Sequence, residues 1–160
     1  PFVGIYSEGS GPITQKMELS EKRQITLGPQ ICYDSLDVSF SRNLALNGAE
    51  LIFNVTNDSW FGSWAEPYQH GIMTLARAIE VRRPLVRSTN TGISWAILAN
   101  GTLLEGSPID QTWTHTYKID YIKNPPQSFF SRFGHFDWMF WVLLFIFLVW
   151  KFKGVKKQNA

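Results

Sequence analysis

The sequence predicts an α/β domain that is followed by a strongly apolar helix near the C-terminal end. Short apolar segments with strand character alternate with two segments of helical periodicity, which is the pattern of α/β folds. Residues 138–150 form an unbroken apolar run, and lysines follow it. The only cysteine, Cys32, stands where an apolar segment gives way to a polar one. Together these features predict one folded domain, one terminal helix and one candidate reactive residue.

The first segments predict a loop, a strand and a helix. Residues 1–23 are rich in Gly, Ser and Pro and then become charged, so we expect a loop. Residues 24–31 are a strand candidate. Residues 35–46 have helical spacing, and Asn-Gly at 47–48 provides a helix stop. Cys32 is therefore expected at a sharp turn between strand and helix, with the first free helix amides facing its sulfur.

The next segments predict a buried strand, a loop and a second helix. Residues 51–55 are almost continuously apolar and precede turn-forming residues, as in a buried strand. Residues 56–66 form a long polar and aromatic loop. Pro67 suits a first helical turn, and apolar residues at helical spacing continue until Pro84 forces a stop. The segment between the two prolines is therefore expected to be helical.

Further strands are expected to complete the sheet. Residues 85–88 and 93–98 flank a Thr-Asn-Thr-Gly turn and are strand candidates. Asn-Gly at 100–101 is a strong hairpin signal. Residues 113–119 alternate polar residues with aromatic or apolar ones, which predicts one more half-buried strand. An Asn-Pro-Pro sequence then begins a linker, which we place at residues 124–135.

Composition limits the classes of function. The chain has 160 residues, enough for one domain with a sizeable core, and we expect a fragment because it begins with Pro1 instead of Met. Charged residues make up 18% and aromatic residues 15%, and the formal net charge is only +2. This balance argues against disorder and against nucleic-acid binding. With one cysteine, the chain can form no internal disulfide.

The terminal apolar run predicts a transmembrane helix, which we place at residues 136–153. A spanning helix needs about 20 apolar residues, and aromatic and lysine side chains at the ends extend the run. A buried core helix is the alternative, but core helices seldom stay apolar on every face. The lysines predict a basic cytoplasmic tail at residues 154–160, and they place the preceding domain on the other side of the membrane.

Cys32 has two interpretations from the residues alone. Free cysteines are mostly buried and behave as small apolar residues. At a strand-to-helix turn the sulfur is instead exposed, and helix amides there favour a thiolate and can stabilise an oxyanion. The position of Cys32 favours the nucleophile. His70 could act as its base in a dyad, but no sequence feature brings the two together.

Several motifs together resemble one family. Ile-Cys-Tyr-Asp at 31–34 is followed by Thr-Asn-Asp-Ser-Trp-Phe-Gly at 56–62, by Pro-Tyr-Gln-His at 67–70, and by Arg-Arg-Pro-Leu-Val-Arg-Ser-Thr-Asn-Thr-Gly at 82–92. With the terminal helix, these motifs resemble the carbon-nitrogen hydrolase (nitrilase) superfamily, and more closely its membrane-bound branch, the apolipoprotein N-acyltransferases. Nearly everything from Gly28 to the C-terminus takes part in the resemblance.

The resemblance implies a fold, a location and a reaction. The fold is a nitrilase-like αββα sandwich on the periplasmic face of the bacterial inner membrane, and residues 1–123 would be its C-terminal part. The reaction moves a fatty acyl chain from a phospholipid to a cysteine, and then from this thioester to the N-terminal amino group of a diacylglyceryl-cysteine apolipoprotein. No cofactor is implied. The general-base Glu and a Lys would lie upstream, so this chain alone is expected to be inactive.

The resemblance also implies the residues of the site. Cys32 matches the nucleophile, and Tyr33 and Asp34 stand beside it. Asp34 replaces the Glu that is usual in the acyltransferase branch, whereas Cys-Tyr-Asp is common among soluble amide hydrolases of the superfamily. The substitution moves a carboxylate back by one methylene and keeps its charge.

The aromatic loop is expected to face the substrate or the lipid through Asn57, Trp60, Phe61 and Trp64. A core position is the alternative for the aromatic residues, but a polar, glycine-containing loop ahead of a membrane anchor favours a surface that reaches lipid. Asn57 and its neighbour Asp58 are expected mainly to shape the loop by hydrogen bonds to the backbone.

The remaining charged residues are expected to be structural. Arg87 lies in a strand that reads as buried, so it should pair with a carboxylate. Arg82 and Arg83 are expected to be a charge pair at a helix C-terminus in preference to a phosphate site. The three histidines are too scattered for a metal site, and none is expected.

Two alternatives to the acyltransferase come from other classes. One is a membrane-tethered amidohydrolase of small amides, which Asp34 favours. The other is a tethered interaction domain that has kept the nitrilase shell without its catalytic residues. The terminal helix and the aromatic loop favour the acyltransferase.

Overall fold

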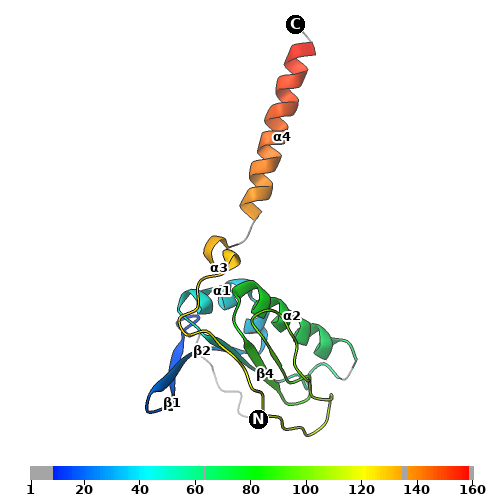
Figure 1. The fold of residues 1–160 in the computed structure, drawn as a ribbon. Coiled ribbons are helices and arrows are strands. Elements are labelled where there is room, and N and C mark those ends of the chain that lie inside the picture. The colour runs from blue at the N-terminus through cyan, green and yellow to red at the C-terminus, as the bar shows by residue number, and fades with distance from the viewer. Residues whose placement is uncertain (1–8, 63, 135–136, 159–160) are drawn as a thin grey trace.

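A five-stranded mixed sheet organises the computed structural model, which describes residues 9–62, 64–134 and 137–158 (Figure 1). The sheet order follows the chain: β1 (Gln15–Ser20), β2 (Arg23–Ile31), β3 (Leu51–Thr56), β4 (Leu85–Thr89) and β5 (Trp95–Ile97). β2, β3 and β4 are parallel, and the outer strands β1 and β5 are antiparallel to their neighbours. The carboxyl ends of the parallel strands therefore meet at one edge, where α/β proteins commonly place their ligands.

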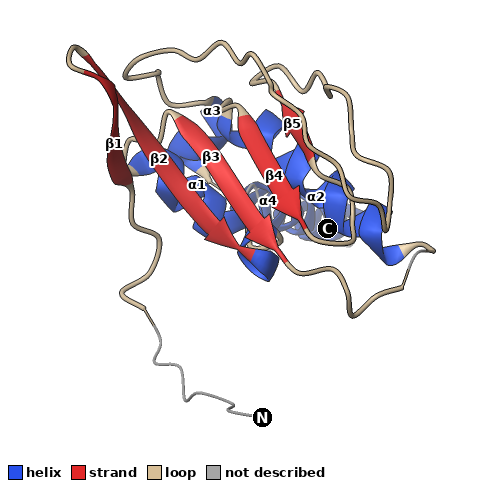
Figure 2. Cartoon of the chain, turned by 90° about the horizontal axis from the view of Figure 1, so that it is seen from below, coloured by secondary structure: helices blue, strands red, loops and turns tan. Residues whose placement is uncertain are grey.

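Two helices cover one face of the sheet, as Figure 2 shows. α1 (Val38–Leu46) connects β2 to β3, and α2 (Glu66–Val81) connects β3 to β4. Gly28 lets α1 approach β2, because a Cβ at this position would lie 3.3 Å from the side chain of Leu44. The buried core lies between helices and sheet and consists of Ala45, Ile52, Ala78, Val81, Leu85, Ile93, Trp95 and Ile97. The α/β prediction is confirmed.

The opposite face of the sheet is open in the described part of the chain. Ile31, Phe53 and Val55 point to this face and are 69%, 37% and 39% exposed. Their neighbours in β3, Ile52 and Asn54, point to the helices and are fully buried. The described residues thus form one helical layer and one sheet layer.

Two strand predictions differ from the structure. Residues 1–23 were expected to be a loop, but β1 lies within them and forms an exposed hairpin with β2. Its charged residues suit an edge strand, which pairs through its backbone and needs no apolar face. Residues 113–119 were expected to be a strand and are not one. Their aromatic rings instead stack on one another, with Trp113 and His115 centroids 5.1 Å apart.

The first helix begins later than the spacing predicts. Cys32 opens a short 3₁₀ turn, η1 (Cys32–Ser35), and α1 starts only at Val38. Asp37 causes the break, because its extended backbone makes it the N-cap and its side chain accepts a hydrogen bond from the Ser39 amide at 2.7 Å. The sequence had suggested that the free amides of the helix follow Cys32 directly. In the structure the η1 turn and Asp37 separate them from it.

The C-terminal part contains two helices. α3 (Phe129–Phe133) falls within the expected linker, and Ser128 Oγ joins this segment to α2 by donating to the Glu80 carbonyl at 2.6 Å. α4 (Asp137–Gln158) extends away from the sheet (Figure 1). Within the residues that the structure describes, no helix has both the length and the hydropathy needed to cross a bilayer. His135 and Phe136 lie outside the described residues.

Candidate active site

Cys32 lies in a strained turn at the carboxyl end of β2. Its φ of 52° is left-handed, which costs a non-glycine residue on the order of 1–3 kcal/mol. Asp34 Oδ2 accepts a hydrogen bond from the Ile31 amide at 2.8 Å. The Cys32 carbonyl accepts from Ser35 Oγ at 3.0 Å and from Asn54 Nδ2 at 3.3 Å. These bonds hold the strained backbone and leave the thiol half-buried.

A fully buried ion pair lies behind this turn. Arg87 in β4 donates from Nη2 to Asp58 Oδ2 at 2.5 Å and from Nη1 to Asn54 Oδ1 at 2.8 Å. His70 Nδ1 lies 2.9 Å from Asp58 Oδ1, and His70 Nε2 lies 3.5 Å from Ser35 Oγ. The sequence prediction that Arg87 pairs with a carboxylate is confirmed. Asp58, expected mainly to shape the loop, is its partner.

The charges within the network stabilise one another. Burial alone raises the pKa of the Asp58 carboxyl, but the hydrogen bond from His70 and the charge of Arg87 bring this pKa below its ordinary value. Burial lowers the pKa of the Arg87 guanidinium, and the negative charges of Asp58 and of a Cys32 thiolate oppose that change only in part. Arg87 is thus neutralised mainly by Asp58 and lies close enough to Cys32 to interact with it electrostatically.

Acid should destabilise the domain through its two buried carboxylates. Burial raises the pKa of Glu50, but hydrogen bonds from the Asn124 and Thr26 amides and from Lys123 lower it overall, and the pKa of Asp58 is lowered too. Carboxylates whose folded pKa is depressed stabilise the fold above their unfolded pKa, which is about 4, and this contribution is lost as the pH falls further. We expect the melting temperature to change little between pH 7 and 5 and to fall steeply below about pH 4. A flat melting temperature between pH 5 and 3 would contradict this.

Three rings pack beside Cys32. Tyr33 stacks on His70 with centroids 5.1 Å apart, and Phe61 meets both rings edge-on at 6.1 and 6.0 Å. A small cavity of about 120 Å³ opens here, and it is lined by Tyr33, Leu36, Phe61, Glu66, Gln69, His70 and Met73. The structure therefore places Phe61 against Tyr33, which directly follows Cys32.

The rest of the predicted loop divides into two kinds of residue. Trp60 and Trp64 are 79% and 86% exposed, which excludes the core alternative for them. Asn57 shapes the loop, as expected, because its Oδ1 accepts hydrogen bonds from the Ser59 amide at 3.1 Å and from Asn90 Nδ2 at 2.7 Å. The two tryptophans are thus presented to the exterior by a loop that side-chain hydrogen bonds hold.

Sequence reasoning missed the residues that link the buried network to the turn. Asn54 and Ser35 both bind the Cys32 carbonyl. His70 contacts Ser35 and Asp58, and within the described part of the chain no hydrogen bond joins it to Cys32. One usable signal was the Asn inside the otherwise apolar segment 51–55, because a polar side chain in a buried strand needs a partner.

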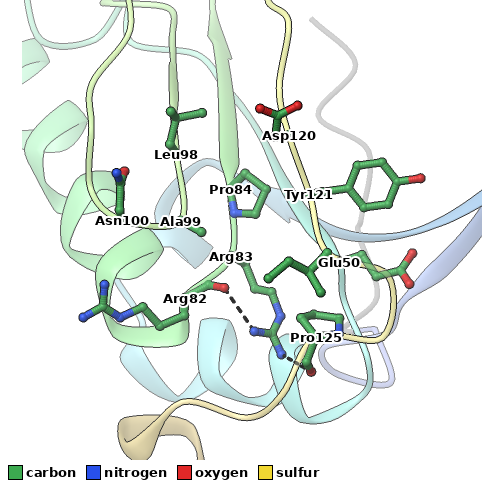
Figure 3. Close-up of a pocket in the computed structure, with 11 residues that line it drawn as sticks. Glu50, Arg82, Arg83, Pro84, Leu98, Ala99, Asn100, Asp120, Tyr121 and Pro125 are labelled. Carbon is green, nitrogen blue, oxygen red and sulfur yellow. Dashed lines mark hydrogen bonds between the residues drawn. The ribbon is translucent and has the colours of Figure 1, made fainter.

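A second cavity lies at the opposite, amino edge of the parallel strands (Figure 3). It measures about 280 Å³. Arg83 beside it is buried and donates to the carbonyls of Ala49 at 2.7 Å, Val81 at 3.1 Å and Pro125 at 3.2 Å. Arg82 ends α2 with a left-handed φ of 55°. This arrangement agrees with the structural role expected for the two arginines.

No group of three side chains that could hold a metal ion occurs among the residues that the structure describes. His70 is part of the buried network, and His115 lies between Trp113 and Tyr117.

The mixed sheet and the strained cysteine turn at the end of a parallel strand define an α/β protein of the nitrilase type. The chain belongs to the carbon-nitrogen hydrolase family, whose sequence pattern matches residues 4–122.

Relatives and solved structures agree with this assignment. The chain is 53% identical over 139 residues to the apolipoprotein N-acyltransferase of Bdellovibrio bacteriovorus and 33% identical over 141 residues to that of Geobacter metallireducens. These matches cover 87% and 86% of this chain, but the chain spans only about a quarter of the length of either relative. The NitN amidase of Nesterenkonia sp. AN1 shares the fold, with a TM-score of 0.52 and 23% identity over 66% of this chain and 42% of the amidase.

Proposed function

We propose that this chain is the cysteine-bearing part of an apolipoprotein N-acyltransferase. The observation that carries the proposal is the 53% identity to a relative of that name over 87% of the chain. In the proposed arrangement, residues 1–123 belong to the nitrilase-like domain, residues 124–135 join it to a membrane helix at 136–153, and residues 154–160 form a basic cytoplasmic tail. The domain would then lie in the periplasm.

The proposed reaction has two steps at the Cys32 sulfur. A base from another part of the intact protein removes the thiol proton, and the thiolate attacks the ester carbonyl of a phospholipid. The C–O bond breaks, and the lysophospholipid leaves with the proton. The α-amino group of a diacylglyceryl-cysteine then attacks the thioester, which forms the amide and returns the thiol. The strained turn that presents Cys32 at the carboxyl end of β2 supports this role.

The exposed side chains of α4 support a membrane location. Trp138, Trp141, Phe145 and Trp150 are each more than half exposed, although all of them are apolar. A soluble protein rarely exposes so large an apolar surface. Lysines follow the apolar run, which favours a cytoplasmic C-terminus.

The two exposed tryptophans should assist the lipid donor. We expect the double substitution Trp60→Ala and Trp64→Ala to slow acylation of Cys32 by phospholipid vesicles by about tenfold, because exposed aromatic residues favour the membrane interface. The melting temperature should change little, since neither side chain is buried. Ile122→Ala is the control, because Ile122 is 64% exposed and lies beside the cavity at the other edge of the sheet. An equal loss of acylation and of stability in the tryptophan variant would contradict this role.

The amidohydrolase alternative is the weaker one. It is favoured by Asp34, which lies one methylene short of the Glu usual in the acyltransferases. In the structure the Asp34 carboxylate folds back onto the Ile31 amide and closes the cysteine turn. The similarity to solved amidases is a similarity of fold, and it does not favour amidohydrolase activity over acyl transfer.

Mass spectrometry of Cys32 tests the proposal. The intact protein is incubated with phospholipid, and the peptide that contains Cys32 is weighed. A fatty acyl thioester supports the acyltransferase. Rapid hydrolysis of small amides without such an adduct would support the amidohydrolase, and an unmodified thiol with neither activity would support the interaction domain.

A further inference from the structure

Asp58, His70 and Ser35 form a chain of side chains that resembles a catalytic triad in its order. Asp58 Oδ1 lies 2.9 Å from His70 Nδ1, and His70 Nε2 lies 3.5 Å from Ser35 Oγ. The three residues come from the loop after β3, from α2 and from η1.

Burial excludes a second nucleophile at Ser35. Ser35 and Asp58 are fully buried, and His70 is 5% exposed. The Ser35 hydroxyl also donates its proton to the Cys32 carbonyl at 3.0 Å, so it has no free path to a substrate. The chain of contacts therefore ends on the backbone of Cys32.

The orientation of the His70 ring is fixed at Nδ1 and at one face. A carboxylate can only accept hydrogen bonds, so His70 Nδ1 is the donor in its bond to Asp58 Oδ1. The other Asp58 oxygen is held by Arg87 at 2.5 Å. Tyr33 stacks on the ring face at an interplanar angle of 16°. With Nδ1 and the face held, Nε2 can point only toward Ser35.

We propose that His70 is a positioning residue, which acts through Ser35 to keep Cys32 in its left-handed turn. The Nε2 edge of the ring contacts Ser35 Oγ at 3.5 Å, and this contact keeps the serine oxygen in place within hydrogen-bond reach of the Cys32 carbonyl. Asn54 holds the same carbonyl from β3, so two bonds maintain a backbone conformation that a cysteine rarely adopts. The inference rests on the proposed function, in which this turn presents the nucleophile.

Two substitutions of His70 separate positioning from general support of the fold. Asparagine places its amide where Nδ1 lies, so His70→Asn keeps the bond to Asp58 and loses the contact with Ser35. Glutamine places its amide where Nε2 lies, so His70→Gln keeps the contact with Ser35 and loses the bond to Asp58. A role limited to supporting the ion pair would therefore favour Asn, and positioning through Ser35 favours Gln.

The experiment measures the rate at which iodoacetamide alkylates Cys32 in the intact protein, followed on the peptide that contains Cys32. We expect His70→Asn and Ser35→Ala each to slow alkylation by about tenfold, because the free energy of one hydrogen bond corresponds to about that change in rate. His70→Gln should stay within about threefold of the natural protein. The double variant Ser35→Ala with His70→Asn should be no slower than either single variant, because both remove the same link. His115→Asn is the matched control and should leave the rate unchanged.

Several results would overturn the proposal: an unchanged rate in Ser35→Ala, a slower rate in His70→Gln than in His70→Asn, or additive losses in the double variant. If His70→Asn does not fold, Ser35→Ala, which removes a single oxygen, decides the question. The proposed function fails separately, when phospholipid leaves no acyl adduct on natural Cys32 while the alkylation rates still follow the expected order.

Discussion

Replacing Cys32 with serine in the intact protein is expected to lower acyl transfer by about 10⁴-fold or more. A hydroxyl is far less ionised than a thiol at neutral pH, and loss of a covalent nucleophile removes the first step of the reaction. The measurement is the amount of N-acylated lipoprotein formed from phospholipid, together with the search for an acyl adduct at position 32.

The serine variant also carries its own structural control. Serine has the same shape as cysteine apart from one atom, so the strained turn, with its φ of 52°, is retained at a similar cost. The melting temperature should therefore stay within a few degrees of the natural protein. Acyl transfer within tenfold of the natural rate in a folded Cys32→Ser variant would remove Cys32 from the chemistry and would end the proposed mechanism.

Replacing Asp58 with asparagine should produce the largest loss of stability. In the natural pair both side chains are fully inaccessible to water. The substitution removes the negative charge and leaves the Arg87 guanidinium buried without its counter-ion. Breaking such a pair from one side costs about 3–5 kcal/mol. His70 would also lose the carboxylate that holds its Nδ1 proton. Urea unfolding of the intact protein, followed by tryptophan fluorescence, measures the change.

Glu80→Gln is the matched control for Asp58→Asn. Glu80 also pairs with an arginine, since Arg77 Nη2 lies 2.8 Å from its Oε1, but its side chain is 26% exposed. Water can replace part of the lost interaction, so the expected cost is about 1 kcal/mol or less. An Asp58→Asn variant that loses no more stability than Glu80→Gln would show that the buried pair does not support the fold.

Elements that bury apolar residues could be predicted from the sequence, because the apolar residues of a buried face recur at the period of the helix or strand. β3, β4 and α2 fall where apolar spacing and prolines indicated them. β1 was missed because this exposed edge strand is held by backbone hydrogen bonds, which do not require particular side chains. Residues 113–119 were predicted wrongly because alternation reflects half-burial and does not require a pairing strand.

The candidate site was predictable only where one residue carried the information. Cys32 could be singled out because it is unique and follows a strand, and Arg87 because a buried charge needs a partner. The link from Asp58 through His70 to Ser35 joins three segments that are far apart in the chain. Only the packing of α2 against η1 brings them together, and no local spacing encodes that contact.

Two of the buried arginines, Arg87 and Arg83, lie at opposite ends of the parallel strands, so substitutions near one should not affect the other. Arg87 sits behind the cysteine turn, whereas Arg83 ties the chain together at the far border of the parallel strands. Changes at well-separated positions with no shared partners add their effects. Substitutions that fill the cavity in Figure 3 should therefore stabilise the domain without changing the reactivity of the Cys32 thiol.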